Sequence, residues 1–176
     1  MEPEVTAVFE LVTCTWQYIV SDPNTRSAAI IDSVLDYDPR IATISTQSAD
    51  ALLDMISEKN LHVEFILETH AHADHLTAAS YLQTKLSQLQ AGSVTGIIKP
   101  PICIGKRIRQ VQNIFASNFG ISNQEHAKAF GKLWADDEEF AIGELSARAV
   151  HLPGHTPDHM GYHIGSKSGP SPPLQS

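Results

Sequence analysis

A short apolar segment, Val63 to Leu67, runs directly into the polar stretch Glu68 to Leu76. A segment that is apolar almost throughout is typical of a strand covered on both faces. The polar stretch places four groups able to bind a metal within six consecutive positions: His70, His72, Asp74 and His75. Ligands in sheets of parallel strands collect beyond the carboxyl ends of the strands. The pattern therefore predicts a metal site at the end of a buried strand.

Periodicity on either side of this segment predicts a mixture of helices and strands. Spaced apolar residues predict a helix over about 48–59, with Ser48 as its N-cap, and a second helix from about Thr77. The buried stripe of the second helix is expected to comprise Ala78, Tyr81, Leu82, Leu86 and Leu89. Helical spacing that begins at Ile104 predicts a third helix over about 105–116, and a turn is expected at 133–137. Segments rich in β-branched and aromatic residues, or with alternating polarity, predict strands at 5–13, 16–20, 28–31, 96–98, 138–142, 144–152 and 160–164.

This order of elements indicates an α/β (α+β) fold. A strand-rich start, helices in the middle and a second set of strands fit two sheets packed between helix layers. The chain has 176 residues, of which 42% are hydrophobic, and this is enough for one domain with a proper core. We expect that domain to span residues 1–165. Residues 166–176 have little to bury and are expected to be a disordered tail.

Composition narrows the range of functions. Twelve basic and twenty acidic residues give a net charge of −8, which argues against a nucleic-acid partner. No apolar run approaches the length of a membrane span, and the acidic N-terminus resembles neither a secretory signal nor a mitochondrial transit peptide. We therefore expect a cytoplasmic protein, or a mitochondrial one if its native N-terminus differs. The two distant cysteines, Cys14 and Cys103, fit no C-x-x-C pattern and are expected to be free.

Three histidines carry the metal hypothesis. His70 and His72 are two residues apart on an extended segment, so both can face one ion. His155 lies between prolines and Gly154 in a tight loop and can supply a third imidazole. Three imidazoles suit zinc, which lowers the pKa of a bound water to about 7. Two imidazoles with a carboxylate suit Fe(II).

The other polar residues between 151 and 163 are expected to have lesser roles than His155. His151 ends a strand and is expected to be a supporting or structural group. Asp158 is expected to shape the loop, and Thr156 can hydrogen-bond a ligand. His159 and His163 fall within the expected strand region and are predicted not to bind metal.

Two segments resemble the signatures of a known family. Thr-His-Ala-His-Ala-Asp-His at 69–75 resembles the H-x-H-x-D-H motif of the metallo-β-lactamase superfamily, and His-Leu-Pro-Gly-His-Thr at 151–156 resembles its second motif. Together with the segments 102–105, 108–112 and 133–136, they make the chain similar to the persulfide dioxygenase branch. That branch is related to glyoxalase II and includes bacterial β-lactamase-hydrolase-like proteins. The resemblance covers about residues 5–165.

The resemblance implies an αββα sandwich with the metal at one edge of its two sheets. In persulfide dioxygenases it implies one Fe(II) held by His70, His155 and a later aspartate. In binuclear zinc relatives, His72 joins the first metal site while Asp74 and His75 serve the second. The implied reaction is the oxidation of glutathione persulfide by O₂ and water to sulfite and glutathione. In glyoxalase II relatives it is the hydrolysis of a glutathione thioester.

The sequence departs from the family pattern after the second motif. The family's bridging aspartate is expected within 164–176, and this window contains neither Asp nor Glu. We therefore expect a truncated domain whose second half is incomplete, in which Asp74 is the candidate catalytic carboxylate. Fe(II) is the favoured cofactor and zinc the alternative. A zinc thioester hydrolase and an inactive fragment remain alternative functions, and a homodimer remains open.

Overall fold

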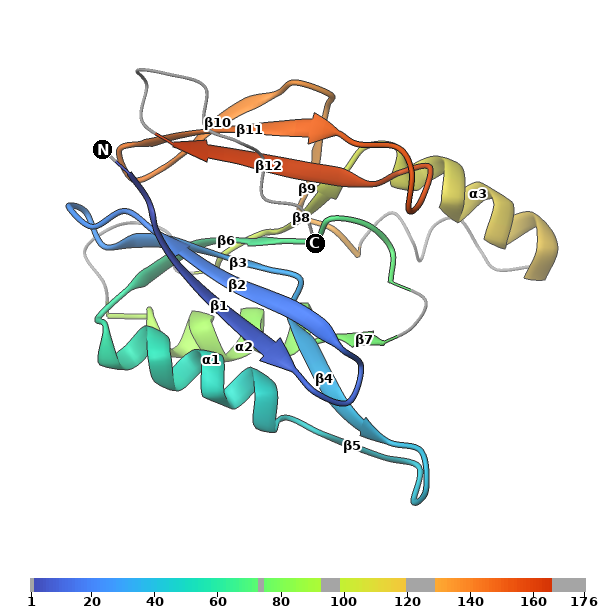
Figure 1. Cartoon of the computed structure of the whole chain (residues 1–176), viewed down its shortest axis with the longest axis horizontal. Helices are drawn as coiled ribbons and strands as arrows, with labels where there is room; N and C mark the ends of the chain where they lie inside the picture. The colour runs from blue at the N-terminus through green and yellow to red at the C-terminus, as the bar shows by residue number, and fades with distance from the viewer. Residues whose placement is uncertain (1, 73–74, 93–98, 120–128, 166–176) are drawn as a thin grey trace.

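The fold is built in layers around one large sheet. The structure is a computed structural model that describes residues 2–72, 75–92, 99–119 and 129–165. Figure 1 shows two helices below the large sheet and a small second sheet above it. The expected α/β fold with packed sheets is confirmed, and among the described residues α1 and α2 form the helix layer on one face of the large sheet. The predicted strand at 96–98 and the predicted tail at 166–176 lie outside the described residues.

The large sheet has six strands in the order β1-β2-β3-β6-β8-β9. The first three pair antiparallel, whereas β3, β6, β8 and β9 run parallel to one another. The carboxyl ends of these four parallel strands therefore meet at one edge of the sheet. The strands span Glu4–Glu10 (β1), Thr15–Ser21 (β2), Ser27–Ile31 (β3), His62–Leu67 (β6), Ile102–Gly105 (β8) and Lys132–Trp134 (β9).

Two three-stranded sheets complete the strand content of the described chain. The upper sheet is antiparallel and comprises β10 (Glu139–Ile142), β11 (Leu145–His151) and β12 (Met160–Gly165). The other comprises β5 (Thr43–Ser45), β4 (Val34–Asp38) and β7 (Leu76–Thr77). Figure 1 shows the β4–β5 hairpin projecting away from the body of the molecule.

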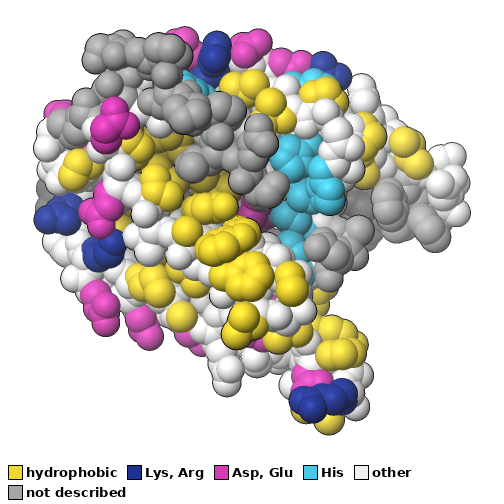
Figure 2. All heavy atoms as spheres, viewed as in Figure 1, with side chains coloured by type: hydrophobic (Ala, Val, Ile, Leu, Met, Phe, Trp, Pro, Cys, Tyr) yellow, Lys and Arg dark blue, Asp and Glu magenta, His cyan; other side chains and the backbone are white. Residues whose placement is uncertain are grey.

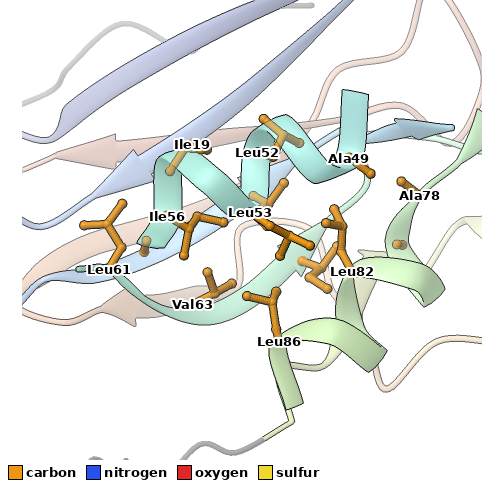
Figure 3. Close-up of a cluster of buried hydrophobic side chains, with 14 of the residues drawn as sticks. Ile19, Ala49, Leu52, Leu53, Ile56, Leu61, Val63, Ala78, Leu82 and Leu86 are labelled. Atoms are coloured by element: carbon orange, nitrogen blue, oxygen red, sulfur yellow. The ribbon is translucent and has the colours of Figure 1, made fainter. Parts of the chain in front are cut away.

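The first hydrophobic core lies between the large sheet and its helices. Helix α1 (Gln47–Glu58) and helix α2 (Ala79–Leu89) turn apolar faces toward the strands, as their helical spacing requires. Figure 3 shows Leu53 of α1 and Leu82 and Leu86 of α2 gathered near Val63 of β6. Packing from both faces explains why the β6 segment is apolar almost throughout. The third helix, α3, spans Ile108–Phe119.

The second hydrophobic core lies between the two sheets. Val20, Ile31 and Leu67 face it from the large sheet, and Met160 and Tyr162 face it from β12. The Tyr162 hydroxyl donates a hydrogen bond of 2.8 Å to the Glu68 carbonyl oxygen, directly after β6. The two sheets are thus joined next to the histidine-rich segment.

Several local predictions are wrong for identifiable reasons. Thr46, not Ser48, occupies the N-cap position of α1, because the Ser48 hydroxyl and amide are bound by the Asp36 carboxylate from the neighbouring β4 strand. Leu89 is 64% exposed, because the next residue, Gln90, takes the buried position, where its side-chain amide hydrogen-bonds Val63 of β6. The expected turn at 133–137 overlaps β9, and Ile104 belongs to β8 and not to a helix. Strands of three or four residues are too short to show a period.

Candidate metal centre

The predicted metal-binding residues come from both sheets. His70 and His72 follow β6, whose carboxyl end lies beside that of β3. His155 lies in the loop between β11 and β12 of the upper sheet. The Met160 amide donates a hydrogen bond of 2.8 Å to the Thr69 carbonyl oxygen, and this bond brings the loop's end against the β6 segment.

A pocket of about 190 Å³ opens over these residues, and we call it the histidine pocket. Figure 2 shows a patch of histidine side chains near the middle of the face in view. The pocket brings together residues from the start of β2, the ends of β3 and β6, and the β11–β12 loop. It is lined by Cys14, Thr15, Trp16, Asp32, His70, His72, His75 and His155.

The imidazole rings of the pocket are in mutual contact. The His70 ring centroid lies 4.0 Å from that of His72 and 4.8 Å from that of His155. The His72 centroid lies 4.1 Å from that of His75, whose Nδ1 lies 3.3 Å from the Thr15 hydroxyl. Four of the five predicted ligands therefore share one pocket. The fifth, Asp74, which is also the predicted catalytic residue, lies outside the described residues.

Hydrogen bonding fixes which nitrogen of His70 can bind a metal. The Thr69 hydroxyl donates to Asp32 Oδ2 at 2.8 Å and lies 2.8 Å from His70 Nδ1. A hydroxyl has a single proton, so with that proton given to Asp32 it accepts a hydrogen bond from His70 Nδ1–H. Nε2 of His70 is then the nitrogen with a free lone pair. Orientation of a metal ligand through its other nitrogen is common in metal sites.

Burial keeps the His70 imidazole in the neutral form that a metal requires. The side chain is buried, and loss of hydration, followed by the neighbouring His72, lowers the His70 pKa to about 4. A neutral imidazole retains the lone pair that binds an ion. The electrostatics of the pocket therefore suit a cation at this position.

Asp32 organises the base of the pocket. It follows β3 and adopts a left-handed backbone conformation (φ 50°), which is uncommon for a residue other than glycine. Its Oδ1 accepts the Thr69 amide at 2.7 Å and lies 3.2 Å from His72 Nε2. If His72 Nε2 carries its proton toward Asp32, Nδ1 is left to bind a metal.

Asp32, Glu68 and His72 also form a group whose ligand atoms lie within 4.8 Å of one another, close enough to hold an ion themselves. Both Asp32 oxygens, however, already accept hydrogen bonds from Thr69. The group is therefore better suited to orienting His72 than to replacing the histidines as ligands. Sequence patterns did not indicate Asp32 or Glu68. A usable signal is that Asp32 directly follows a buried strand, as the Glu68–His72 segment does.

His159 lies in the pocket region and not within a strand as expected. It immediately precedes β12, is 7% exposed, and its ring centroid lies 4.9 Å from that of His70. Its Nδ1 is buried without a hydrogen-bond partner among the described residues. That His159 does not bind metal stays a prediction. His163 does lie in β12, opposite Arg148.

The remaining loop residues have structural contacts. His151 ends β11, and its Nε2 lies 3.0 Å from the Pro157 carbonyl oxygen, as suits the structural role expected of it. Asp158 is buried within the same loop. The loop that carries His155 is thus held across its base.

The histidine-rich edge of a two-sheet fold is the arrangement of a known family. The model of the metallo-beta-lactamase superfamily matches residues 15–168. The chain therefore belongs to the metallo-β-lactamase superfamily, whose members bind metal ions.

Individual relatives point to different activities within the superfamily. The chain is 39% identical over 160 residues to a Burkholderia pseudomallei protein named "Probable metallo-hydrolase", covering 90% of this chain and 50% of the relative. It is 39% identical over 164 residues to glyoxylase B2 of Dictyostelium discoideum, covering 90% and 51%. Against the human mitochondrial persulfide dioxygenase ETHE1, identity is 34% over 84 residues, covering 48% and 29%. The chain spans about half the length, or less, of these relatives.

Solved structures support the fold. ETHE1 from Myxococcus xanthus superposes with a TM-score of 0.60 at 21% identity, covering 92% of this chain and 53% of that one. A metallo-β-lactamase from Staphylococcus aureus superposes with a TM-score of 0.66 at 16% identity, covering 99% and 42%. In the described part of the chain, no helix has the length and apolarity needed to cross a membrane.

Proposed function

We propose that the chain belongs to a metal-dependent oxidoreductase of the persulfide dioxygenase type. The observation that carries the proposal is the histidine pocket, in which hydrogen bonds orient His70 and His72 and the second sheet contributes His155. The likeness to persulfide dioxygenases supports this choice within the superfamily. The substrate class is a small molecule, glutathione persulfide.

We assign the ion to His70, His72 and His155, a set that suits zinc, with Asp74 as the carboxylate that Fe(II) would need and His75 as a further member of the metal-binding motif. The donor set fits an ion, because imidazoles whose second nitrogens are already bonded are ready ligands. Fe(II) is the proposed metal and zinc the alternative. Fe(II) held there would supply the redox chemistry between O₂ and the persulfide, whereas zinc would supply Lewis acidity.

The overall reaction is balanced without a further reductant. One glutathione persulfide, one O₂ and one water give one glutathione, one sulfite and two protons. The S–S bond breaks, the outer sulfur is oxidised, and O₂ takes up the four electrons. Water provides the third sulfite oxygen.

The protein's own contribution is to hold its ligands and to admit the substrate from one side. Thr69 and Asp32 restrain the imidazoles, so little rearrangement is needed when the ion binds. Trp16 and Cys14 line the same pocket, so a substrate bound there would contact them.

A zinc-dependent glutathione thioester hydrolase is the second candidate. The likeness to glyoxylase B2, which covers 90% of this chain, favours it. The same histidine pocket serves both candidates, because both reactions need a metal beside a glutathione-bound sulfur.

Metal analysis and two activity assays on one preparation, persulfide oxidation and thioester hydrolysis, distinguish the two candidate functions. Protein loaded with Fe(II) is expected to consume O₂ with glutathione persulfide and to release sulfite. The variant His70→Ala is expected to lose this turnover, whereas the matched variant His163→Ala retains it. Thioester hydrolysis by the zinc-loaded protein, without O₂ uptake by the iron-loaded protein, would favour the hydrolase. Failure of both assays would contradict both candidates.

A further inference from the structure

Glu68 is a buried carboxyl group that no metal motif accounts for. It directly follows β6, two residues before His70, and is 3% exposed. The Thr77 hydroxyl donates a hydrogen bond to its Oε1. Its Oε2 is buried without a hydrogen-bond partner among the described residues and lies 3.6 Å from His72 Nε2.

The surroundings of Glu68 make a purely structural role costly. A buried carboxyl group with an unbonded oxygen loses hydration that nothing replaces. A second carboxylate, Asp32, lies at the same histidine nitrogen, 3.2 Å from it. The main chain at this point is also held, because the Glu68 carbonyl oxygen accepts the Tyr162 hydroxyl. The side chain is therefore fixed at both ends beside His72.

We propose that Glu68 is a positioning residue of the metal centre. Thr77 holds one of its oxygens, and the other lies beside His72 Nε2, where its partial negative charge adds to the contact with Asp32 and favours the Nε2–H tautomer, so that His72 Nδ1 faces the ion. This inference rests on the proposed role of His72 as a metal ligand. Two elements would then help to position His72: the end of β3, which supplies Asp32, and β7, which supplies Thr77.

The tautomer of His72 provides a test that needs neither metal nor substrate. In the metal-free full chain, ¹⁵N NMR of the imidazoles is expected to show His72 protonated at Nε2. Protonation at Nδ1 would overturn the proposal, because the two carboxyl groups would then face an unprotonated nitrogen. Zinc added to the wild-type chain is expected to shift the Nδ1 resonance of His72. A shift at Nε2 would place the ion among Asp32, Glu68 and His72 and would also overturn it.

Metal affinity tests the role of the side chain directly. Zinc affinity, measured by competition with a chelator, is expected to fall about tenfold or more in Glu68→Leu, as for other groups that orient metal ligands. Glu68→Gln keeps an acceptor for His72 and is expected to remain close to wild type. Glu64→Leu is the matched control, because Glu64 lies in β6, the strand that Glu68 follows, but bonds Ser27 and Gly143.

Wild-type affinity in a folded Glu68→Leu variant would overturn the proposal. Should that variant not fold, Thr77→Val removes the hydroxyl that holds Oε1 and that also accepts the Ala79 amide, and is expected to weaken zinc binding severalfold. Unchanged affinity in Thr77→Val would then count against the proposal. All of these measurements are independent of persulfide turnover, so a failed activity assay and a failed role for Glu68 are distinguishable.

Discussion

At the scale of single residues, the hydroxyl of Thr69 decides how the pocket presents His70. It has one proton, which it gives to Asp32, so its oxygen is left to accept the proton of His70 Nδ1. The Thr69 amide bonds the same carboxylate. A single side chain thus couples the end of β3 to the first histidine of the metal motif.

Replacing this hydroxyl is expected to weaken metal binding without unfolding the chain. Thr69→Val preserves the shape of the side chain and the amide bond to Asp32, but leaves His70 Nδ1 without its acceptor. We expect zinc affinity to fall by about tenfold or more. Thr69→Ser restores the hydroxyl and is expected to bind zinc nearly as tightly as wild type. Equal affinity in Thr69→Val and wild type would contradict the assignment.

The pH dependence of stability offers a second test at this scale. Burial, followed by the charge of Asp32, raises the pKa of Glu68 to about 8 from 4.5. Between these values the folded chain keeps a proton that the unfolded chain has released. The free energy of unfolding contributed by this group therefore falls as pH rises from about 4.5 to about 8.

Glu68→Gln cannot titrate and is expected to lack this decline. Urea unfolding of the metal-free chain, followed at several pH values across that window, measures the difference between wild type and variant. We expect the wild-type chain to lose at least about 1 kcal/mol relative to the variant over the window. Parallel pH profiles would show that Glu68 is not held protonated.

At the scale of elements, β6 and the helices that cover it position the metal motif. Helical spacing predicted α1 and the buried residues Leu82 and Leu86 of α2, because amphipathic faces repeat over several turns. The same spacing wrongly included Leu89, because the polar Gln90 beside it occupies the buried position against β6. Strands β8 and β9 were missed because they are short and are defined by their pairing, which only the folded sheet reveals.

The two ends of α2 give a matched pair of stability variants. Leu82 is 0% exposed and packs in the core shown in Figure 3, whereas Leu89 is 64% exposed on the same helix. Leu82→Ala is expected to lower the free energy of unfolding by about 2–5 kcal/mol through lost burial and a residual cavity. Leu89→Ala is expected to change it by no more than about 0.5 kcal/mol. Similar losses in the two variants, by urea unfolding, would contradict the assigned packing.

At the scale of the whole molecule, the candidate site exists only because the two sheets are joined. The motif at 69–75 could be identified from the sequence, and so could His155, because their residue types and spacing resemble family signatures. Asp32 could not, since its place beside Thr69 follows from the parallel pairing of β3 with β6. The prediction that His159 lies within a strand was wrong, because β12 begins one residue later, at Met160.

The central claim is that histidines from both sheets bind one ion. Titration of the metal-free full chain with zinc, followed by calorimetry, tests it most directly in wild type, His155→Ala and His163→Ala. We predict stoichiometric binding by wild type and His163→Ala, and binding weaker by about tenfold or more in His155→Ala. Wild-type affinity in a folded His155→Ala variant would show that the second sheet does not contribute to the metal centre.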